Sequence, residues 1–253
     1  MQINTIQEDF CEIALANDNG ISTGFEDLDD RFGGFKKGKL YLLGGRPQMG
    51  KTTLTIDMTL NALAQGKKVV IFSLHELATH YVKRLVDILS KRAELIGISE
   101  SENEKNIEAA KTWLSCRNLT IDDTPGVSIE EISNSGLLDE TDLVVIDYYQ
   151  LLSLSESDCK KSVGELKKLA EEKKTAILVI SQVYKTCENR KDYRPLLKDF
   201  FKGADLYADV VMAMYRDEYY RPDTDKKRIT EIGVLQNRDG TRGVVELIWS
   251  PDN

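Results

Sequence analysis

The sequence predicts an α/β fold, with a mostly parallel central sheet, helices on both faces and an antiparallel hairpin near the C-terminus. The first observation is the segment GRPQMGKT at residues 45–52, which matches the phosphate-loop pattern G-x-x-x-x-G-K-[ST] between a strand-like run and a helical segment. The second is the pair of apolar runs at residues 143–147 and 176–180, which are typical of parallel strands buried on both faces. The length favours one large domain, expected over residues 21–253.

The N-terminal segment, residues 1–20, is predicted to stand apart from this domain. Residues 5–16 are predicted to form a short amphipathic helix, and a polar turn follows it. The apolar residues that fall on one face of this helix are Ile6, Phe10 and Ile13. Because an apolar stripe must be buried, the helix packs either on its own domain or on a neighbour.

Hydrophobic periodicity predicts the remaining elements. Apolar runs predict strands at residues 39–43, 67–74, 119–123, 143–147, 176–180, 209–215, 229–236 and 244–249. Amphipathic or capped segments predict helices at residues 53–65, 77–90, 102–116, 128–133 and 160–172. The last two strands flank the turn NRDG at residues 237–240, and this turn predicts the C-terminal hairpin.

The phosphate loop predicts a nucleotide site. Gly45 and Gly50 let the backbone turn tightly, so that successive N–H groups and the positive end of the following helix face a polyphosphate. Lys51 is expected to reach the outer phosphates, and the Thr52 hydroxyl is expected to hold Mg²⁺. The residues expected to bind ATP are Gly45, Arg46, Pro47, Gln48, Met49, Gly50, Lys51, Thr52 and Thr53.

Asp147 ends the apolar run at residues 143–147, which we expect to be a central parallel strand. Its carboxylate would enter the crevice at the carboxyl edge of the sheet. Beside a phosphate loop, such an acid is expected to order the Mg²⁺ ion together with Thr52.

Composition and charge restrict the expected compartment and partners. No apolar run approaches the ~20 residues that span a bilayer, and the N-terminus lacks the features of a signal peptide. The four cysteines are widely spaced without a C-x-x-C pair, which favours a reduced, cytoplasmic protein. The net charge of −8 gives no global attraction to nucleic acid, so any DNA contact must come from a local basic surface.

From residue 22 to residue 249, the sequence resembles the C-terminal ATPase domain of DnaB-type replicative helicases, and it lacks the N-terminal domain of that family. The motifs that carry the resemblance, in order, are TGFEDL (23–28), GRPQMGKTT (45–53), IFSL (71–74), IDYYQL (146–151), SQ (181–182), YRDE (215–218) and QNRDG (236–240). The resemblance implies a RecA-like P-loop NTPase fold that works as a hexameric ring.

The resemblance also implies roles for single residues. Gln182 would sense the γ-phosphate, and Arg238 would be an arginine finger that enters the nucleotide site of the next subunit. Residues 1–20 would correspond to a linker helix that docks on the adjacent subunit. Single-stranded DNA would be the substrate, and the resemblance does not identify a loader or primase for this chain.

One departure concerns catalysis. The family strand ends in Ser-Leu-Glu, whereas here Leu74 is followed by His75 and then Glu76. A neutral imidazole accepts a proton, so His75 is expected to be a weaker general base. Alternation along a strand would turn Glu76 to the opposite side unless the strand shifts by one residue. We expect intact ATP binding with slow turnover; the catalytic candidates are His75, Glu76, Asp147, Gln182 and Arg238.

The second departure concerns DNA. The DNA loop of the family has become KDFFKGAD at residues 198–205, and Gln236 replaces a lysine. Residues 185–202 still carry six basic side chains against three acidic ones. The basic residues are Lys185, Arg190, Lys191, Arg194, Lys198 and Lys202. This excess predicts weak, sequence-independent binding to single strands through phosphates.

Three functions remain open. The first is an ATP-driven DnaB-type helicase or translocase that acts in replication. The second is an ATP-binding, ring- or filament-forming relative that has lost unwinding and serves a regulatory or loading role. The third is a RecA- or RadA-like recombination ATPase, which the runs DYYQL and NRDGTRG disfavour. A metal pair of His75 and His80 is rejected, because a five-residue spacing does not align two ligands on a helix.

Overall fold

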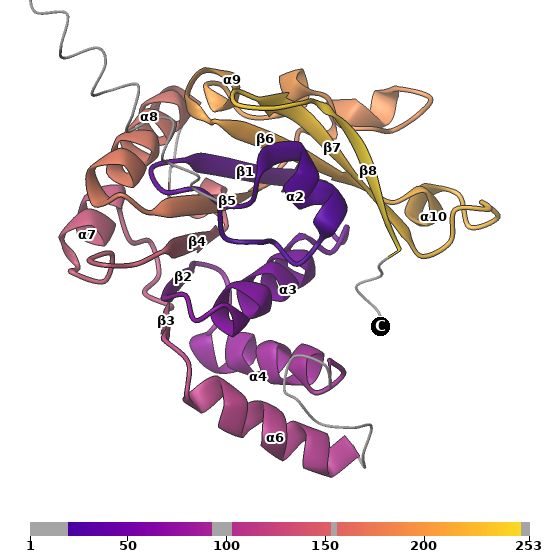
Figure 1. The fold of residues 1–253 in the computed structure, drawn as a ribbon. Helices are drawn as coiled ribbons and strands as arrows, with labels where there is room; N and C mark the ends of the chain where they lie inside the picture. Colours follow the sequence, from indigo (N-terminus) through magenta and orange to yellow (C-terminus); the bar gives the residue numbers. More distant parts are fainter. Residues whose placement is uncertain (1–19, 93–102, 153–155, 249–253) are drawn as a thin grey trace, which may run out of the picture.

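The computed structural model describes residues 20–92, 103–152 and 156–248, so the helix expected at residues 5–16 lies outside the described residues. Its eight-stranded sheet has the order β3-β2-β4-β5-β1-β6-β7-β8 (Figure 1). The strands are β1 (Leu40–Gly45), β2 (Val69–Ser73), β3 (Leu119–Asp122), β4 (Leu143–Asp147), β5 (Ala176–Gln182), β6 (Val210–Tyr215), β7 (Ile229–Asn237) and β8 (Gly243–Ile248). Strands β1 to β6 pair in parallel, and β7 and β8 form an antiparallel hairpin.

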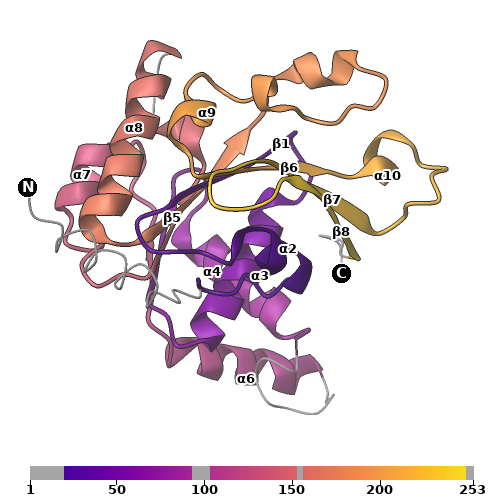
Figure 2. The ribbon, with the colours of Figure 1, turned by 45° about the horizontal axis from the view of Figure 1, so that its top comes forward.

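Helices cover both faces of the sheet. The helices are α2 (Glu26–Phe32), α3 (Lys51–Ala64), α4 (Ala78–Leu89), α6 (Asn103–Ser115), α7 (Ile129–Asn134), α8 (Glu156–Lys173), α9 (Ala204–Tyr207) and α10 (Asp217–Tyr220). One core packs α2, α3, α4 and α6 against one face, and a second core packs α7, α8 and α9 against the other. Figure 2 shows α6 as the outermost helix of its layer.

Strand β1 shows why both faces are apolar. Tyr41 and Leu43 belong to the core under α3, whereas Leu40 and Leu42 belong to the core under α8. Successive side chains of a strand point to opposite faces, so a central parallel strand must be apolar at every position. The predicted α/β fold with its C-terminal hairpin is confirmed.

The largest difference from the predicted elements lies between β5 and β6. This segment, for which hydrophobic periodicity predicts no helix, contains the short 3₁₀ helices η2 (Lys185–Asn189) and η3 (Leu197–Asp199) together with α9. Such short turns bury too few residues to show periodicity in the sequence. Helix α8 also begins at Glu156, before the expected residue 160.

The parallel strands bring the expected site residues to one edge of the sheet. The phosphate loop follows β1, Asp147 ends β4 and Gln182 ends β5. None of the helices in residues 20–92, 103–152 and 156–248 has the length and apolar content needed to cross a bilayer.

Candidate nucleotide site

The phosphate loop has the backbone geometry that its sequence predicts. Gly50 precedes α3 in a left-handed conformation with φ 92°, and Gln48 also has a positive φ of 63°. At Gly45, a Cβ atom would lie 3.2 Å from the Met214 carbonyl oxygen, so the strand end has little room for a side chain. The loop therefore turns directly into the N-terminus of α3, where free N–H groups favour anions. Pro47 and Gln48 lie on the surface, and Met49 is buried in the core.

Lys51 begins α3, and its Nζ donates to the Arg46 carbonyl oxygen at 3.0 Å. The pKa of Lys51 is lowered to about 8, chiefly by burial; Asp147 opposes this shift and Arg46 adds to it. Burial thus disfavours the charged ammonium by more than Asp147 offsets, and a bound polyphosphate would stabilise it.

Asp147 is 1% exposed, and its Oδ2 is a buried atom without a hydrogen-bond partner among the residues that the structure describes. Burial raises the pKa of its carboxyl group, while His75, a hydrogen bond from Thr52 and the nearby Arg84 and Lys51 partly offset the rise. A buried carboxylate with an unpartnered oxygen beside a threonine hydroxyl is a donor set that suits Mg²⁺. The residues present therefore fit the expected ion.

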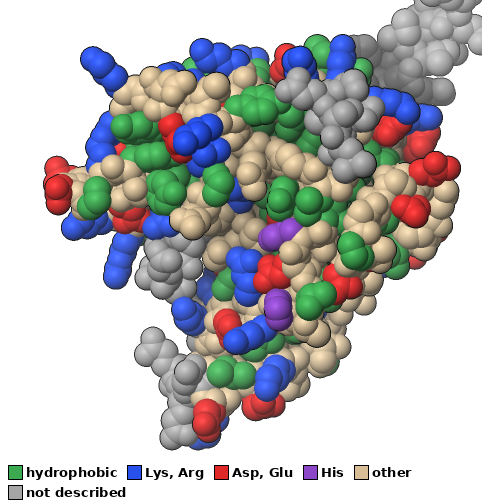
Figure 3. Space-filling model, turned by 180° about the vertical axis from the view of Figure 1, so that it is seen from behind, with side chains coloured by type: hydrophobic (Ala, Val, Ile, Leu, Met, Phe, Trp, Pro, Cys, Tyr) green, Lys and Arg blue, Asp and Glu red, His purple; other side chains and the backbone are tan. Residues whose placement is uncertain are grey.

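His75 lies against Asp147. Its Nδ1 is 3.3 Å from the Asp147 carbonyl oxygen and 3.8 Å from Asp147 Oδ1. When Nδ1 carries the proton and donates to that carbonyl, Nε2 keeps its lone pair and can accept a proton. The histidine side chain is exposed, and both histidines of the chain are visible on one face of the molecule in Figure 3.

Strand alternation does not extend to Glu76, so alternation does not decide the side to which this residue points. Strand β2 ends at Ser73, and residues 74–76 form a bend. Glu76 Oε2 accepts from Arg84 Nη1 at 3.0 Å, and Arg84 Nη2 donates to Thr53 Oγ1 at 3.1 Å. Arg84 thus ties Glu76 to the first turn of α3, a connection that no motif in the sequence indicated.

Gln182 is positioned by a second glutamine. Its N–H donates to Gln150 Oε1 at 3.2 Å, and its carbonyl oxygen accepts from Gln150 Nε2 at 2.9 Å. In the sheet, Gln182 is the partner of Gly45. The glutamine therefore lies beside the start of the phosphate loop.

Arg238 lies at the end of the sheet where the parallel strands begin, opposite the end that carries the phosphate loop. Asn237 is the sheet partner of Val210, and Val210 is the partner of Tyr41. Tyr41 and Gly45 are four residues apart on β1, roughly 13 Å at about 3.3 Å per residue, and Arg238 continues away from the phosphate loop. The exposed Arg238 side chain donates to the Leu206 carbonyl oxygen. The structure does not bring Arg238 to the phosphate loop of its own chain.

Arg190 and Arg194, two of the six basic residues expected to face DNA, are engaged by carboxylates of their own chain. Arg190 pairs with the buried Asp199, and Arg194 donates to Glu231 through both Nε and Nη2 at 2.7 Å. The other four basic residues are exposed: Lys185, Lys191, Lys198 and Lys202.

The two phenylalanines of this segment are buried. A Cβ on Gly44 would lie 2.3 Å from the Phe200 ring, and the Phe201 ring stacks on Tyr149 with 4.1 Å between centroids. The segment that departs from the family sequence is therefore anchored in the core beneath the nucleotide site.

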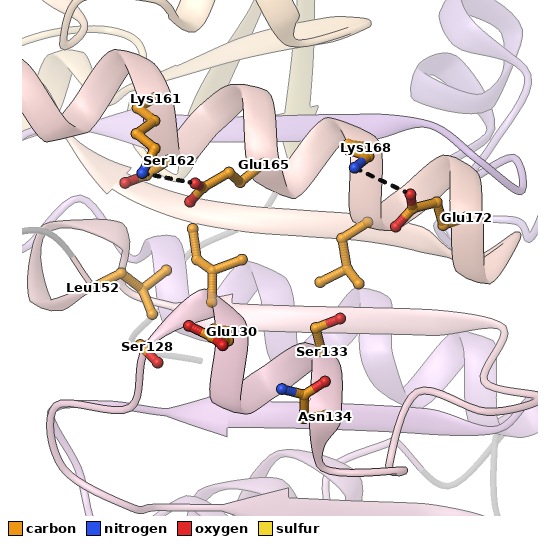
Figure 4. Close-up of a pocket in the computed structure, with 12 residues that line it drawn as sticks. Ser128, Glu130, Ser133, Asn134, Leu152, Lys161, Ser162, Glu165, Lys168 and Glu172 are labelled. Atoms are coloured by element: carbon orange, nitrogen blue, oxygen red, sulfur yellow. Dashed lines mark ion pairs between the residues drawn. The ribbon is translucent and has the colours of Figure 1, made fainter.

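A separate groove lies between α7 and α8 (Figure 4). It has a volume of about 530 Å³, and no residue of the phosphate loop lines it. Its lysines are paired with glutamates, Lys161 with Glu165 and Lys168 with Glu172, each at 3.4 Å. The groove therefore differs from the nucleotide site, where Lys51 Nζ donates to a backbone carbonyl oxygen.

Known proteins are similar in sequence to this chain. Residues 20–253 match the family described as DnaB-like helicase C terminal domain. The replicative DNA helicase DnaC of Bacillus subtilis (strain 168) is 32% identical over 252 residues, which cover 91% of this chain and 54% of that protein. The replicative DNA helicase DnaB of Geobacillus stearothermophilus is 32% identical over 251 residues, with the same coverage. The chain thus spans about half the length of the curated relatives it matches.

Solved structures share the fold. One of them is an isolated ATPase domain, which has a TM-score of 0.84 and 28% identity, covering 97% of this chain and 94% of that chain. A structure of a DnaB-like replicative helicase and its interactions with primase has a TM-score of 0.87 and 28% identity, covering 98% and 66%. The expected RecA-like architecture and the DnaB branch are both confirmed. The chain belongs to the DnaB-like helicase C-terminal domain family.

Proposed function

We propose that this chain binds ATP with Mg²⁺ at the phosphate loop and hydrolyses it slowly, as a subunit of a ring-shaped DnaB-type motor that acts on single-stranded DNA. The observation that carries the proposal is the pair of charges at the carboxyl edge of the sheet. Burial lowers the pKa of Lys51 and raises the pKa of Asp147, so the ammonium needs an anion and the carboxylate needs a cation. A magnesium triphosphate supplies both.

Each residue of the site has a distinct part in binding. Backbone N–H groups of the phosphate loop and the Lys51 ammonium would hold the phosphates, and Thr52 with Asp147 would hold the ion. The ion would neutralise charge that develops on the phosphates. Gln182, fixed by Gln150, lies beside Gly45, where it can report an outer phosphate.

The attacking water needs a base, and the imidazole of His75 lies beside Asp147. With Nδ1 directed to the Asp147 carbonyl, Nε2 is free to accept the proton of that water. Glu76 is engaged with Arg84 and is therefore less available. We expect slow turnover, because the neutral imidazole offers the attacking water one acceptor atom, whereas a glutamate would offer two oxygens and a negative charge.

The position of Arg238 in the sheet supports assembly of several copies. Since it lies at the sheet edge opposite its own phosphate loop, it can meet a triphosphate only on another copy of the chain. The turn that carries it is held in place: Asn237 Nδ2 donates to the Arg31 carbonyl at 2.9 Å, and Lys39 pairs with Asp239 at 2.8 Å. We propose that Arg238 acts as an arginine finger between subunits of a ring.

Residues 5–16 offer a second contact between subunits. An apolar groove of about 470 Å³ lies between α4 and α6, lined by Val82, Val86 and Leu114 among others. The predicted stripe on residues 5–16 is apolar and needs a partner surface. We propose that the groove receives this helix from a neighbouring copy.

The second candidate function is an ATP-binding ring or filament that does not unwind DNA. Two observations favour it: His75 stands where the family resemblance expects a glutamate, and Phe200 and Phe201, in the segment that departs from the DNA loop of the family, are buried. The helicase relatives and the four exposed lysines of residues 185–202 favour the first candidate. Binding of single-stranded DNA by the assembled protein separates the two.

The proposal is tested by ATP binding to Lys51→Ala. The change removes a charge-assisted contact of about 1.5–3 kcal/mol, so affinity should fall roughly 10- to 100-fold. Equilibrium dialysis with labelled ATP and Mg²⁺ measures it. Lys83→Ala, which alters an exposed lysine of α4, is the control and should bind like wild type. Unchanged affinity in Lys51→Ala would sink the assignment.

A further inference from the structure

One arginine links the phosphate loop to the segment that follows β5. Arg46 Nε donates to Glu188 Oε1 at 2.8 Å, and Arg46 Nη1 donates to the Val183 carbonyl oxygen at 3.1 Å. The side chains of Arg46 and Glu188 are only 18% and 24% exposed. An ion pair with this much shielding is stronger than one on the open surface, so the link can transmit a displacement.

The carbonyl that Arg46 holds is next to the expected phosphate sensor. Val183 directly follows Gln182, and the Val183 N–H donates to the Gly45 carbonyl oxygen at 3.4 Å. Arg46 therefore fixes the chain immediately after Gln182 as well as η2, which contains Glu188.

Glu188 also contacts a third segment. The Tyr220 hydroxyl donates to Glu188 Oε1 at 3.3 Å. The Tyr220 ring stacks on Tyr193, with 4.6 Å between centroids and 9° between planes. Arg221 Nη2 adds a hydrogen bond of 2.7 Å to the Lys191 carbonyl oxygen. Glu188 thus joins the phosphate loop, the segment that carries the exposed lysines, and the turn after β6.

On the side of the phosphate loop, the Lys51 ammonium can contact either the Arg46 carbonyl oxygen or a bound phosphate. The Arg46 carbonyl oxygen accepts from Lys51 Nζ at 3.0 Å. Lys51 is also the residue proposed to bind phosphate, so a nucleotide would draw the ammonium away from this carbonyl. A bound triphosphate would also order the loop around its phosphates and so restrict Arg46. A fixed Arg46 lowers the entropic cost of holding Glu188 in place.

We propose that Glu188 is a positioning residue that couples the phosphate loop to residues 184–193 through its ion pair with Arg46. The inference rests on the proposed binding of a triphosphate at the phosphate loop. Nucleotide binding should then make residues 184–193 more rigid. It should also raise the affinity of these residues for an anion that contacts their lysines. By thermodynamic linkage, such an anion should raise nucleotide affinity by the same factor.

The test is amide hydrogen exchange on the full chain, with and without Mg²⁺ and a non-hydrolysable ATP analogue. In wild type, amides of residues 184–193 should exchange about threefold more slowly, or slower still, with the analogue. Glu188→Gln should lose this slowing. Its affinity for the analogue should stay within about threefold of wild type, because the variant can lose no more binding free energy than the coupling contributed. Asp139→Asn is the matched control; it removes an ion pair of 2.7 Å to Lys173, away from the phosphate loop, and the slowing should remain.

Three results would overturn the inference. A Glu188→Gln variant that keeps the full slowing shows that the ion pair does not couple the two segments. A wild type that binds the analogue without any response at residues 184–193 refutes the coupling and leaves the proposed nucleotide site intact. A wild type that binds no analogue refutes the proposed site and the coupling with it. If Glu188→Gln does not fold, Glu188→Asp keeps the charge but shortens the side chain that reaches Arg46 Nε, and it should reduce the slowing; an unchanged response would contradict the proposal.

Discussion

At the scale of single residues, the identity of residue 75 is expected to set the rate of hydrolysis. The His75 imidazole lies beside Asp147, and its Nε2 is the proposed proton acceptor. Replacing it by glutamate restores a charged base at the place where the family resemblance expects one. Since a well-placed general base contributes about 10²–10⁴-fold, His75→Glu should raise kcat at least about 10-fold. Steady-state phosphate release at saturating ATP measures this.

Glu76→Gln is the companion variant. It removes the charge that pairs with Arg84 and should change kcat by less than about threefold, because Glu76 acts through Arg84 and Thr53 and not on the water. If Glu76→Gln abolished turnover while His75→Glu had no effect, Glu76 would be the base.

The residues of the phosphate loop and Asp147 could be located from the sequence, because a motif or a strand end determines their positions. The surroundings of residue 76 could not. Alternation predicts orientation only while a strand continues, and β2 ends at Ser73, before the residues in question. The partners Arg84, Gln150 and Glu188 are distant in the sequence and carry no motif, so only the fold brings them to the site.

At the scale of elements, the segment between β5 and β6 combines residues that are bonded to the rest of the chain with lysines that are exposed. Asp199 anchors the bonded part: it pairs with Arg190, accepts from the Leu196 N–H at 2.7 Å, and its carbonyl accepts from the Tyr184 N–H at 2.7 Å. The basic excess of this segment could be counted from the sequence. The engagement of Arg194 within the chain could not be foreseen, because its partner Glu231 lies on another strand.

The difference between the engaged arginines and the exposed lysines of this segment predicts which residues contact DNA. Removing the exposed charges in Lys185→Ala, Lys191→Ala and Lys198→Ala together should weaken binding of single strands at low salt. Each lost phosphate contact should lower the slope of log affinity against log salt by about 0.7, so up to ~2 for three contacts. Fluorescence anisotropy with a labelled oligonucleotide across a salt series measures both quantities.

A triple variant of exposed lysines elsewhere, Lys83→Ala, Lys91→Ala and Lys168→Ala, is the charge-matched control and should keep the wild-type slope. If the two triple variants lose affinity equally, the attraction is a general charge effect. If assembled wild type with ATP binds no single strand even at low salt, the non-unwinding candidate function is favoured.

At the scale of the whole molecule, the order of the strands decides where each functional edge lies. The alternation of strands and helices along the chain predicted a parallel sheet, and the turn at residues 237–240 predicted the hairpin. The position of β6 next to β1 could not be predicted, because it results from packing between distant segments. That position matters, because it sets the phosphate loop at one edge and the Arg238 turn at the other.

In the proposed function, the Arg238 turn of one copy completes the anion site of another. Arg238→Ala should leave ATP binding and assembly unchanged, since the side chain is exposed and donates to a backbone carbonyl oxygen, that of Leu206. Hydrolysis by the assembled variant should fall about 10³-fold or more, as expected for an arginine finger, and wild-type hydrolysis per subunit should rise with protein concentration. Arg242→Ala, an exposed arginine close to the same turn, is the control and should hydrolyse ATP like wild type. Size-exclusion chromatography with light scattering establishes the assembled state in each case, and an assembled Arg238→Ala that is as fast as wild type would exclude a finger at this position.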